Sequence, residues 1–141
     1  MIHVVLGTRA QLVKMAPVLR RLDASGLDYR FVLTGQHRET IDALIADFGL
    51  RRPDARLCDG DDVASPAQTL LWLVRILGRC IAAPRSVFGP QPRGIVLVHG
   101  DTLSTLVGAL LARIAGLRVA HVESGLRSFR RDMTESWGTR V

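Results

Sequence analysis

Four short polar clusters in this chain carry side chains that can bind an anion or transfer a proton. They occupy residues 7–9, 34–37, 99–102 and 123–125, and each directly follows a run of apolar residues. A site that combines cations with carboxylates can hold a phosphate group and move a proton on an atom beside it. The sequence therefore predicts one composite site, provided that the fold brings the four clusters together.

The first cluster, Gly7-Thr8-Arg9, is placed where a strand is expected to turn into a helix. Backbone N–H groups at such a turn, together with the start of the helix, form a site for an anion such as a diphosphate. Lys14 is the only lysine beside eighteen arginines, and it follows about a turn and a half later. A plain tight turn with solvated Arg9 and Lys14 side chains is the alternative. The chain contains no glycine-rich dinucleotide fingerprint.

Two carboxylates, Asp101 and Glu123, end two further apolar runs. Asp101 comes just before an apolar helix, so it is interpreted either as the cap of that helix or as a site residue. Glu123 follows its run directly and opens a turn with Ser124 and Gly125. Two carboxylates in different surroundings can hold different protonation states and act as an acid and a base.

Three histidines accompany these groups. His99 and His121 fall at the last positions of two predicted strands, where core histidines with satisfied hydrogen bonds are expected. His37 belongs to a loop, and its position fits a surface residue as well as a site residue.

The apolar runs themselves are typical of buried parallel strands, because they are nearly continuous in Val, Ile and Leu instead of alternating. They span residues 2–6, 31–33, 95–98 and 117–122. The carboxyl ends of parallel strands share one edge of an open sheet, where ligands bind. This geometry would gather an arginine, a histidine, an aspartate and a glutamate in one crevice.

Helical spacing of apolar residues separates the predicted strands. The first helix should bury one face and have a kink or a late start at Pro17, the face consisting of Leu12, Val13, Ala16, Leu19 and Leu22. Ser65-Pro66 is a start signal for a long helix, which carries Leu70, Leu71, Leu73, Val74, Leu77 and Ile81.

Two more helices are expected over residues 40–48 and 102–115, closed by Gly49 and Gly116, whereas residues 84–94 are expected to form a loop. The alternation predicts an α/β fold with a doubly wound, parallel, Rossmann-like sheet. Residues 1–129 should form this domain. The polar tail, residues 130–141, is interpreted either as a frayed terminus or as a chain cut where another element should follow.

Composition excludes several classes of protein. No apolar run approaches the ~20 residues of a membrane span, and the N-terminus lacks an export signal, which favours the cytoplasm. The net charge of +6 comes from scattered arginines without interleaved aromatic residues, so no nucleic-acid partner is expected. Cys58 and Cys80 fit no metal spacing and are expected to be reduced thiols.

Four motifs in this order resemble the UDP-N-acetylglucosamine 2-epimerase family. Residues 7–17 (GTRAQLVKMAP) look like the opening signature of the family, and residues 34–38 (TGQHR) resemble its second loop. Residues 99–102 (HGDT) and 121–128 (HVESGLRS) are similar to its third and fourth motifs. The resemblance implies the N-terminal Rossmann-like half of a GT-B fold, in which two domains enclose the substrate.

The resemblance also implies an isomerase that inverts C2 of the sugar in UDP-GlcNAc and gives UDP-ManNAc. The family removes the C2 proton while UDP leaves from C1, then adds UDP and a proton back to 2-acetamidoglucal. No cofactor and no metal is implied. The implied catalytic residues are Asp101, Glu123 and Lys14, and the implied substrate-binding residues are Gly7, Arg9, His37 and Arg127.

The chain departs from the family pattern in three places. Ala10-Gln11 stands where family members often carry Pro-Glu. After Ser128 the family continues into a Pro-Glu-Glu loop with a catalytic glutamate, whereas this chain has Met133-Thr134-Glu135-Ser136-Trp137, so Glu135 is not assigned that role. The second domain of the family, which supplies nucleotide contacts and a catalytic histidine, has no counterpart here.

We therefore expect part of a cytoplasmic enzyme for surface-polysaccharide precursors that turns over little substrate alone. Its partners would be the UDP-sugar and either the missing second domain or a homodimer partner, with no membrane. Three alternatives stay open: a hydrolysing branch that releases ManNAc and UDP, a non-catalytic remnant or partner module, and half of a GT-B glycosyltransferase. The paired carboxylates argue against the transferase.

Overall fold

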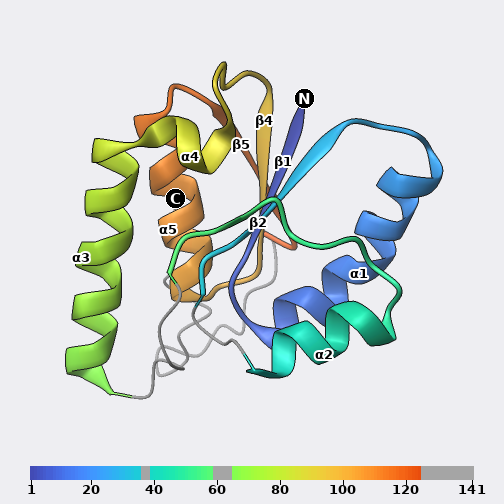
Figure 1. Ribbon diagram of the computed structural model, residues 1–141, viewed down its shortest axis with the longest axis horizontal. Coiled ribbons are helices and arrows are strands. Elements are labelled where there is room, and N and C mark those ends of the chain that lie inside the picture. The colour runs from blue at the N-terminus through green and yellow to red at the C-terminus, as the bar shows by residue number, and fades with distance from the viewer. Residues whose placement is uncertain (36–38, 59–64, 125–141) are drawn as a thin grey trace.

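The computed structural model describes residues 1–35, 39–58 and 65–124 and contains one parallel sheet of five strands (Figure 1). The strands are β1 (Ile2–Leu6), β2 (Tyr29–Leu33), β3 (Ala55–Arg56), β4 (Ile95–His99) and β5 (Arg118–Val122). Their order in the sheet is β3-β2-β1-β4-β5. The order reverses between β1 and β4, so the carboxyl ends of these two strands flank the switch point at which open α/β sheets bind ligands.

The central strand β1 is buried on both faces, as its apolar sequence predicts. Val4, Val5 and Leu6 have no accessible surface. Ile2 pairs with Tyr29 of β2 on one side and with Ile95 of β4 on the other, and both pairs are parallel. This register brings the residues that follow β1, β2 and β4 to the same edge of the sheet.

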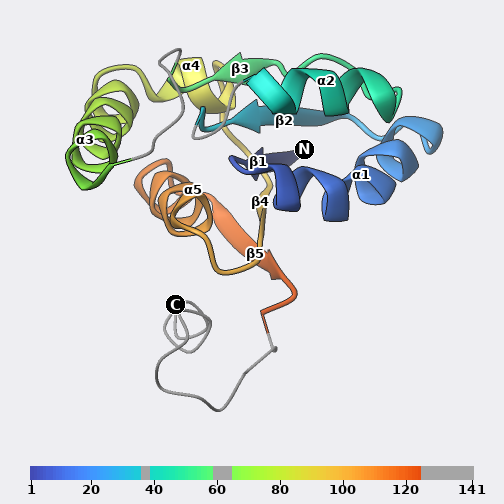
Figure 2. The same cartoon turned by 90° about the horizontal axis from the view of Figure 1, so that it is seen from below.

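Helices cover both faces of the sheet (Figure 2). α1 (Arg9–Ala24) and α2 (Glu39–Asp47) pack on one face, around a buried cluster that includes Leu6, Phe31 and Leu33. α3 (Pro66–Ala82), α4 (Pro84–Phe88) and α5 (Leu103–Ile114) lie on the other face, over a cluster that includes Val5, Val32, Val96 and Val98. The prediction of a doubly wound, Rossmann-like α/β fold is thereby confirmed.

The predicted start signal at Ser65 and the stop signals at Gly49 and Gly116 are confirmed. Ser65 caps α3, and Thr8, which was not predicted as a cap, caps α1. Each forms a capping box with the glutamine three residues later, Gln68 or Gln11. Gly49 and Gly116 follow α2 and α5 with φ values of 60° and 72°, which a glycine adopts without steric cost.

Two details of the first helix differ from the prediction. α1 begins at Arg9 and continues through Pro17, so the late start is wrong. Pro17 lies on the exposed side of α1, where the carbonyl that loses its N–H partner can bind water instead. Val13 was assigned to the buried face, but it is 47% exposed.

The loop predicted over residues 84–94 is wrong at its beginning, because Pro84–Phe88 forms the short helix α4. Val87 and Phe88 are each 1% exposed, and the ring of Phe88 packs edge-on against buried His3 at 5.3 Å. Arg30 of β2 donates to the carbonyls of Ser86 and Val87 and so binds the end of the helix. The two-residue strand β3 was also missed, since it is too short to show a period.

The long helix α3 buries less of its apolar surface than its composition implies. Trp72 and Ile76 are buried, and the indole N–H of Trp72 donates to the carbonyl of Thr34 at 3.2 Å. Four other large apolar side chains of α3 are about half exposed or more, namely Leu70, Leu71, Val74 and Ile81.

Gly7 allows the turn after β1 to lie directly against α5. A Cβ atom at this position would stand 1.9 Å from Ser104 Oγ and 2.2 Å from Thr34 Oγ1. Both hydroxyl groups are buried and are hydrogen-bonded to each other at 3.1 Å. Only a residue without a side chain fits between them.

We expect Gly7→Ala to lower the free energy of unfolding by about 2 kcal/mol or more, because two buried side chains must move to make room. Urea unfolding followed by far-UV circular dichroism measures the change. Gly78→Ala is the control, since a Cβ at Gly78 of α3 meets nothing within 4 Å. That variant should gain about 0.5–1 kcal/mol from helix propensity. Equal effects of the two variants would contradict the packing argument.

Candidate functional site

The ion pair between Lys14 and Glu123 joins the first helix to the end of the last strand of the sheet. Lys14 Nζ lies 2.7 Å from Glu123 Oε2, although the residues are 109 positions apart in the sequence. Lys14 is on α1 and Glu123 follows β5 directly. The side chains are 53% and 38% exposed, so the pair is open to a ligand in solution. Two of the predicted catalytic residues therefore lie together.

His99, the last residue of β4, faces the same carboxylate. Its Nε2 atom lies 3.3 Å from Glu123 Oε2, and its side chain is 4% exposed. Neither ring nitrogen makes a hydrogen bond to any part of the chain that the structure describes. His99 was expected to be a satisfied core histidine; it is buried, but its ring belongs to the site.

The charge state of His99 is set mainly by its burial. Desolvation lowers the pKa of the imidazole, and the negative charge of Glu123 only partly offsets this effect. The ring is therefore neutral near pH 7. A neutral imidazole carries one N–H group and one acceptor nitrogen, and it is Nε2 that faces Glu123.

Glu123 itself is held in its ionised form. The hydrogen bond from Lys14 lowers the pKa of the Glu123 carboxyl, with a smaller contribution from His99 in the same direction. The stabilisation that this ion pair gives the fold is present above the ordinary pKa of a glutamate. It is lost as the pH falls through the lowered value.

The backbone of Glu123 is in the left-handed region, with φ 62°, and among the described residues it is the only one other than glycine with a positive φ. This conformation costs a residue with a side chain roughly 1–3 kcal/mol. The strain occurs at the residue that contacts both Lys14 and His99. Backbone strain held at such a position is typical of functional residues.

Asp101 lies in the turn between β4 and α5, and it does not cap that helix. The N-cap is Thr102, whose hydroxyl oxygen accepts from the N–H of Thr105. Asp101 is exposed. The interpretation of Asp101 as a helix cap is thus wrong, and its carboxylate is open to a ligand.

The Asp101 turn is fastened to the end of β5. The Gly100 N–H donates to the Val122 carbonyl at 3.3 Å, and His121 Nε2 donates to the Gly100 carbonyl at 2.6 Å. Asp101 is therefore held beside the strand that carries Glu123. His121 has a hydrogen-bond partner, as predicted, but its side chain is only partly buried.

The turn after β1 was expected to offer its backbone N–H groups to an anion, but two of these groups already have a partner within the chain. The N–H groups of Gly7 and Thr8 donate to the side-chain oxygen of Gln11 at 2.8 and 3.1 Å. Arg9, the first residue of α1, is exposed. Gln11 was not identified as a functional residue. The spacing of threonine and glutamine, which is that of a capping box, is the sequence signal that could have identified it.

Two predicted binding residues, His37 and Arg127, lie outside the described residues. Their roles, and those of the other predicted site residues, stay predictions. No group of three or more His, Cys, Asp or Glu side chains in the described ranges could hold a metal ion. None of the helices in those ranges is long and apolar enough to cross a membrane.

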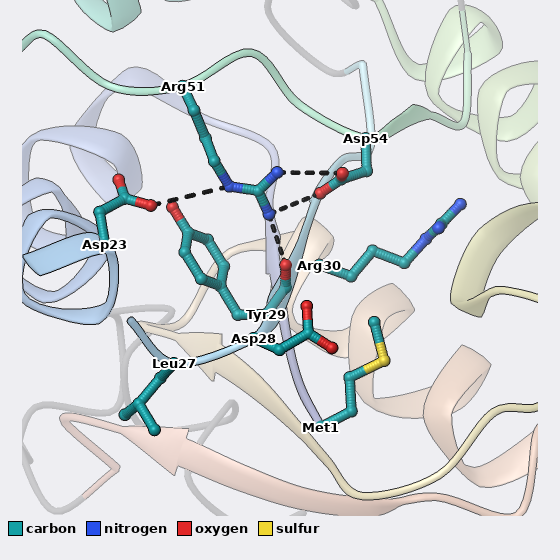
Figure 3. Close-up of a pocket in the computed structure, with 8 residues that line it drawn as sticks. All are labelled: Met1, Asp23, Leu27, Asp28, Tyr29, Arg30, Arg51 and Asp54. Atoms are coloured by element: carbon teal, nitrogen blue, oxygen red, sulfur yellow. Dashed lines mark hydrogen bonds and ion pairs between the residues drawn. The ribbon is translucent and has the colours of Figure 1, made fainter. Parts of the chain in front are cut away.

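A pocket lies at the opposite edge of the sheet, near the start of β2 (Figure 3). Its centre is Arg51, which donates to both carboxylate oxygens of Asp54 at 3.0 and 2.8 Å and lies 4.2 Å from the centroid of the Tyr29 ring. Asp54 also accepts the N–H of Phe31 at 2.7 Å. Burial alone would raise the pKa of Asp54, but these hydrogen bonds outweigh it and lower the pKa. The charged groups satisfy one another, so this pocket anchors β2.

The sheet order and the helices on both faces define a Rossmann-like α/β domain, with charged residues beside its switch point. The profile of the UDP-N-acetylglucosamine 2-epimerase family matches residues 20–138. The chain belongs to this family.

Individual relatives agree with this assignment. The UDP-N-acetylglucosamine 2-epimerase of Methanocaldococcus jannaschii is 34% identical over 136 residues, which are 95% of this chain and 35% of that protein. A probable UDP-N-acetylglucosamine 2-epimerase of Ralstonia solanacearum is 37% identical over 126 residues, 89% of this chain and 32% of that protein. The chain spans about a third of the length of the curated relatives it matches.

Solved structures give the same result. The M. jannaschii UDP-GlcNAc 2-epimerase, in complex with UDP-GlcNAc and UDP, superposes with a TM-score of 0.75 at 28% identity, over 98% of this chain and 36% of that one. The Neisseria meningitidis enzyme bound to UDP-GlcNAc superposes with a TM-score of 0.74 at 27% identity, over 99% of this chain and 37% of that one.

Backbone strain at Glu123 predicts a difference between two truncations. Glu123→Ala and Glu123→Gly both remove the carboxylate, but only glycine adopts a positive φ without steric cost. The glycine variant should be about 1 kcal/mol more stable than the alanine variant in urea unfolding. Greater stability of the alanine variant would show that position 123 is not strained.

The ion pair predicts a titration shift. We expect Lys14→Met to raise the pKa of Glu123 towards the ordinary value of about 4.3, because the largest influence that lowers it is removed. Carbon-13 NMR of the labelled carboxyl group measures the midpoint. Lys14→Arg keeps a cation at this position and serves as the control. An unchanged midpoint in the methionine variant would refute the contact.

Proposed function

We propose that this chain supplies one wall of the active site of a UDP-GlcNAc 2-epimerase. Membership of the family supports this proposal, but the observation that carries it is the Lys14–Glu123 pair beside His99. An ammonium group beside an ionised carboxylate, at the switch point of a Rossmann-like sheet, suits a substrate that loses a diphosphate from one carbon and a proton from the next.

The proposed reaction exchanges no electrons with a cofactor. A carboxylate removes the C2 proton, and the electron pair of the C2–H bond forms a C1=C2 double bond. The C1–O bond breaks, and its electron pair leaves on UDP, which gives 2-acetamidoglucal. Re-addition of UDP at C1 and of a proton at the opposite face of C2 completes the inversion.

Lys14 and Arg9 are proposed to bind the diphosphate, and Asp101 and Glu123 to act as the acid and base groups. A carboxylate with a lowered pKa is a weak base. When Lys14 turns to the diphosphate, Glu123 loses the hydrogen bond that most lowers its pKa. The base therefore becomes stronger when the leaving group is bound.

The remaining contacts are assigned from the resemblance to the family motifs. Gly7, His37 and Arg127 are proposed to contact the substrate, and residues 1–129 to form the N-terminal domain. A second domain or a homodimer partner would complete the cleft, so the 141-residue chain alone should turn over slowly. The hydrolysing reaction, which releases ManNAc and UDP, uses the same residues and is distinguished by its products.

The test is the exchange of the C2 proton of UDP-GlcNAc in D2O, followed by proton NMR, with UDP release followed by phosphorus NMR. We would assay the chain alone and a chimera in which it replaces the matched segment of the M. jannaschii enzyme. The chimera should catalyse exchange. Asp101→Asn and Glu123→Gln should each slow it by roughly 10²-fold or more.

Folding of each chimera is checked by circular dichroism, and its nucleotide site by UDP binding. Lys14→Met should weaken UDP binding, whereas Arg20→Met, on the exposed side of the same helix, should leave it unchanged. A folded chimera that binds UDP and exchanges the proton equally fast with Glu123→Gln would disprove the proposed role of that residue.

A further inference from the structure

Gln11 is a buried polar side chain that connects two strand–helix turns. It lies on the first turn of α1 and is 1% exposed. Its partners include the turn after β1 and the turn after β4, so the contacts span up to 94 positions of sequence. These two turns are the ones that flank the switch point of the sheet.

The two ends of the Gln11 amide bind different turns. The oxygen accepts from the N–H groups of Gly7 and Thr8. The nitrogen donates to the His99 carbonyl at 2.7 Å, and it lies 2.8 and 2.9 Å from the hydroxyl oxygens of Thr102 and Thr105. The contacts at His99 and Thr102 hold the chain on both sides of Asp101.

Backbone chemistry fixes this orientation. A backbone N–H can only donate and a carbonyl can only accept, so the oxygen must face Gly7 and the nitrogen must face His99. A side chain at this position needs an acceptor at one end and a donor at the other. An amide meets this need at any pH. The glutamate that family members often carry here meets it only while its carboxyl group is protonated, because an ionised carboxylate is an acceptor only.

We propose that Gln11 is a positioning residue, which holds His99 and the Asp101 turn in a fixed place relative to Lys14 and Glu123. Lys14 lies three residues further along the same helix, and His99 contacts Glu123. The contacts themselves do not require the proposed function, but the description of the turn as catalytic rests on it.

Gln68 provides a matched control inside the same chain. It forms the same local capping box at the start of α3, where its side-chain oxygen accepts the Ser65 N–H at 3.0 Å. Gln68 is exposed. Methionine at either position removes one capping box of the same kind. Only Gln11→Met also removes the contacts to the turn after β4.

The experiment compares Gln11→Met with Gln68→Met in the complete chain by NMR. In Gln11→Met the His99 ring signals and the titration midpoint of Glu123 should move, and the backbone amide of Thr105 should exchange with solvent about tenfold faster. Gln68→Met should change none of these signals. If both variants leave the signals of His99 and Glu123 unchanged, Gln11 is a capping residue only and the proposal is wrong.

Gln11→Glu provides a test that does not depend on the stability of the methionine variant. The introduced carboxyl group can donate to the His99 carbonyl only when it is protonated, so burial beside that carbonyl should raise its pKa. The His99 signals should match those of the unaltered chain at about pH 5 and depart from them as the pH rises. The nearby titratable groups, Lys14, His99, Asp101 and Glu123, are present in both proteins, and the unaltered chain measured over the same pH range gives their own contribution to the His99 signals.

If the His99 signals of Gln11→Glu differ from those of the unaltered chain by the same amount at every pH, the donor end of Gln11 has no role and the proposal is overturned.

Activity provides a separate readout in the chimera. If the His99 signals move but the chimera catalyses no exchange even with Gln11 intact, the positioning contact stands and the proposed function fails. If exchange is catalysed and Gln11→Met alters neither exchange nor the His99 signals, the positioning role fails and the function stands.

Discussion

The buried amide of Gln11 meets a constraint that the two adjacent turns at the switch point impose. The N–H groups of Gly7 and Thr8 and the carbonyl of His99 are buried there. A buried backbone group left without a partner would cost roughly 1–3 kcal/mol. One side chain supplies an acceptor to the turn after β1 and a donor to the turn after β4. The positions of the charged residues around it depend on this arrangement.

The charged residues of the site lie on the solvent side of this buried network. Lys14 and Glu123 are about half exposed, whereas His99 beneath them is almost completely buried. The burial keeps His99 neutral, and the exposure leaves Lys14 and Glu123 open to exchange their contact for one with a ligand. The buried layer is thus made of neutral polar groups, and the exposed layer is made of ions.

The sequence predicts the fold well because local and global signals agree. The continuous apolar runs of β1 and β4, the cap at Ser65, and Gly49 after α2 each report on a few neighbouring residues. The short helix α4 escaped prediction because its stability comes from tertiary contacts. Val87 and Phe88 fill the core next to His3, and Arg30 binds its last carbonyls. Proline in the first turn is compatible with such a helix.

The site was predictable in its location but not in its contacts. Strand ends at one sheet edge gave the approximate place of Lys14, Asp101 and Glu123, whereas the 2.7 Å contact between Lys14 and Glu123 depends on the strand order. The positive φ of Glu123 and the open ring nitrogens of His99 leave no trace in a pattern of residue types. Gln11 has an ordinary local role, and its long-range role follows only from the packing of β1 beside β4.

The identity of Lys14 has a physical explanation in a chain that otherwise uses arginine. A guanidinium group binds a carboxylate through two parallel hydrogen bonds, as Arg51 binds both oxygens of Asp54 in the structural pocket. Such a fork holds its partner firmly. An ammonium group is a compact charge on a flexible stem and makes one hydrogen bond to Glu123. A cation that must leave a carboxylate and bind a diphosphate does so more easily when it has only one hydrogen bond to break, as the ammonium group has. The one lysine therefore stands where the proposed reaction needs a cation that changes partners, and an arginine stands where the fold needs one that does not.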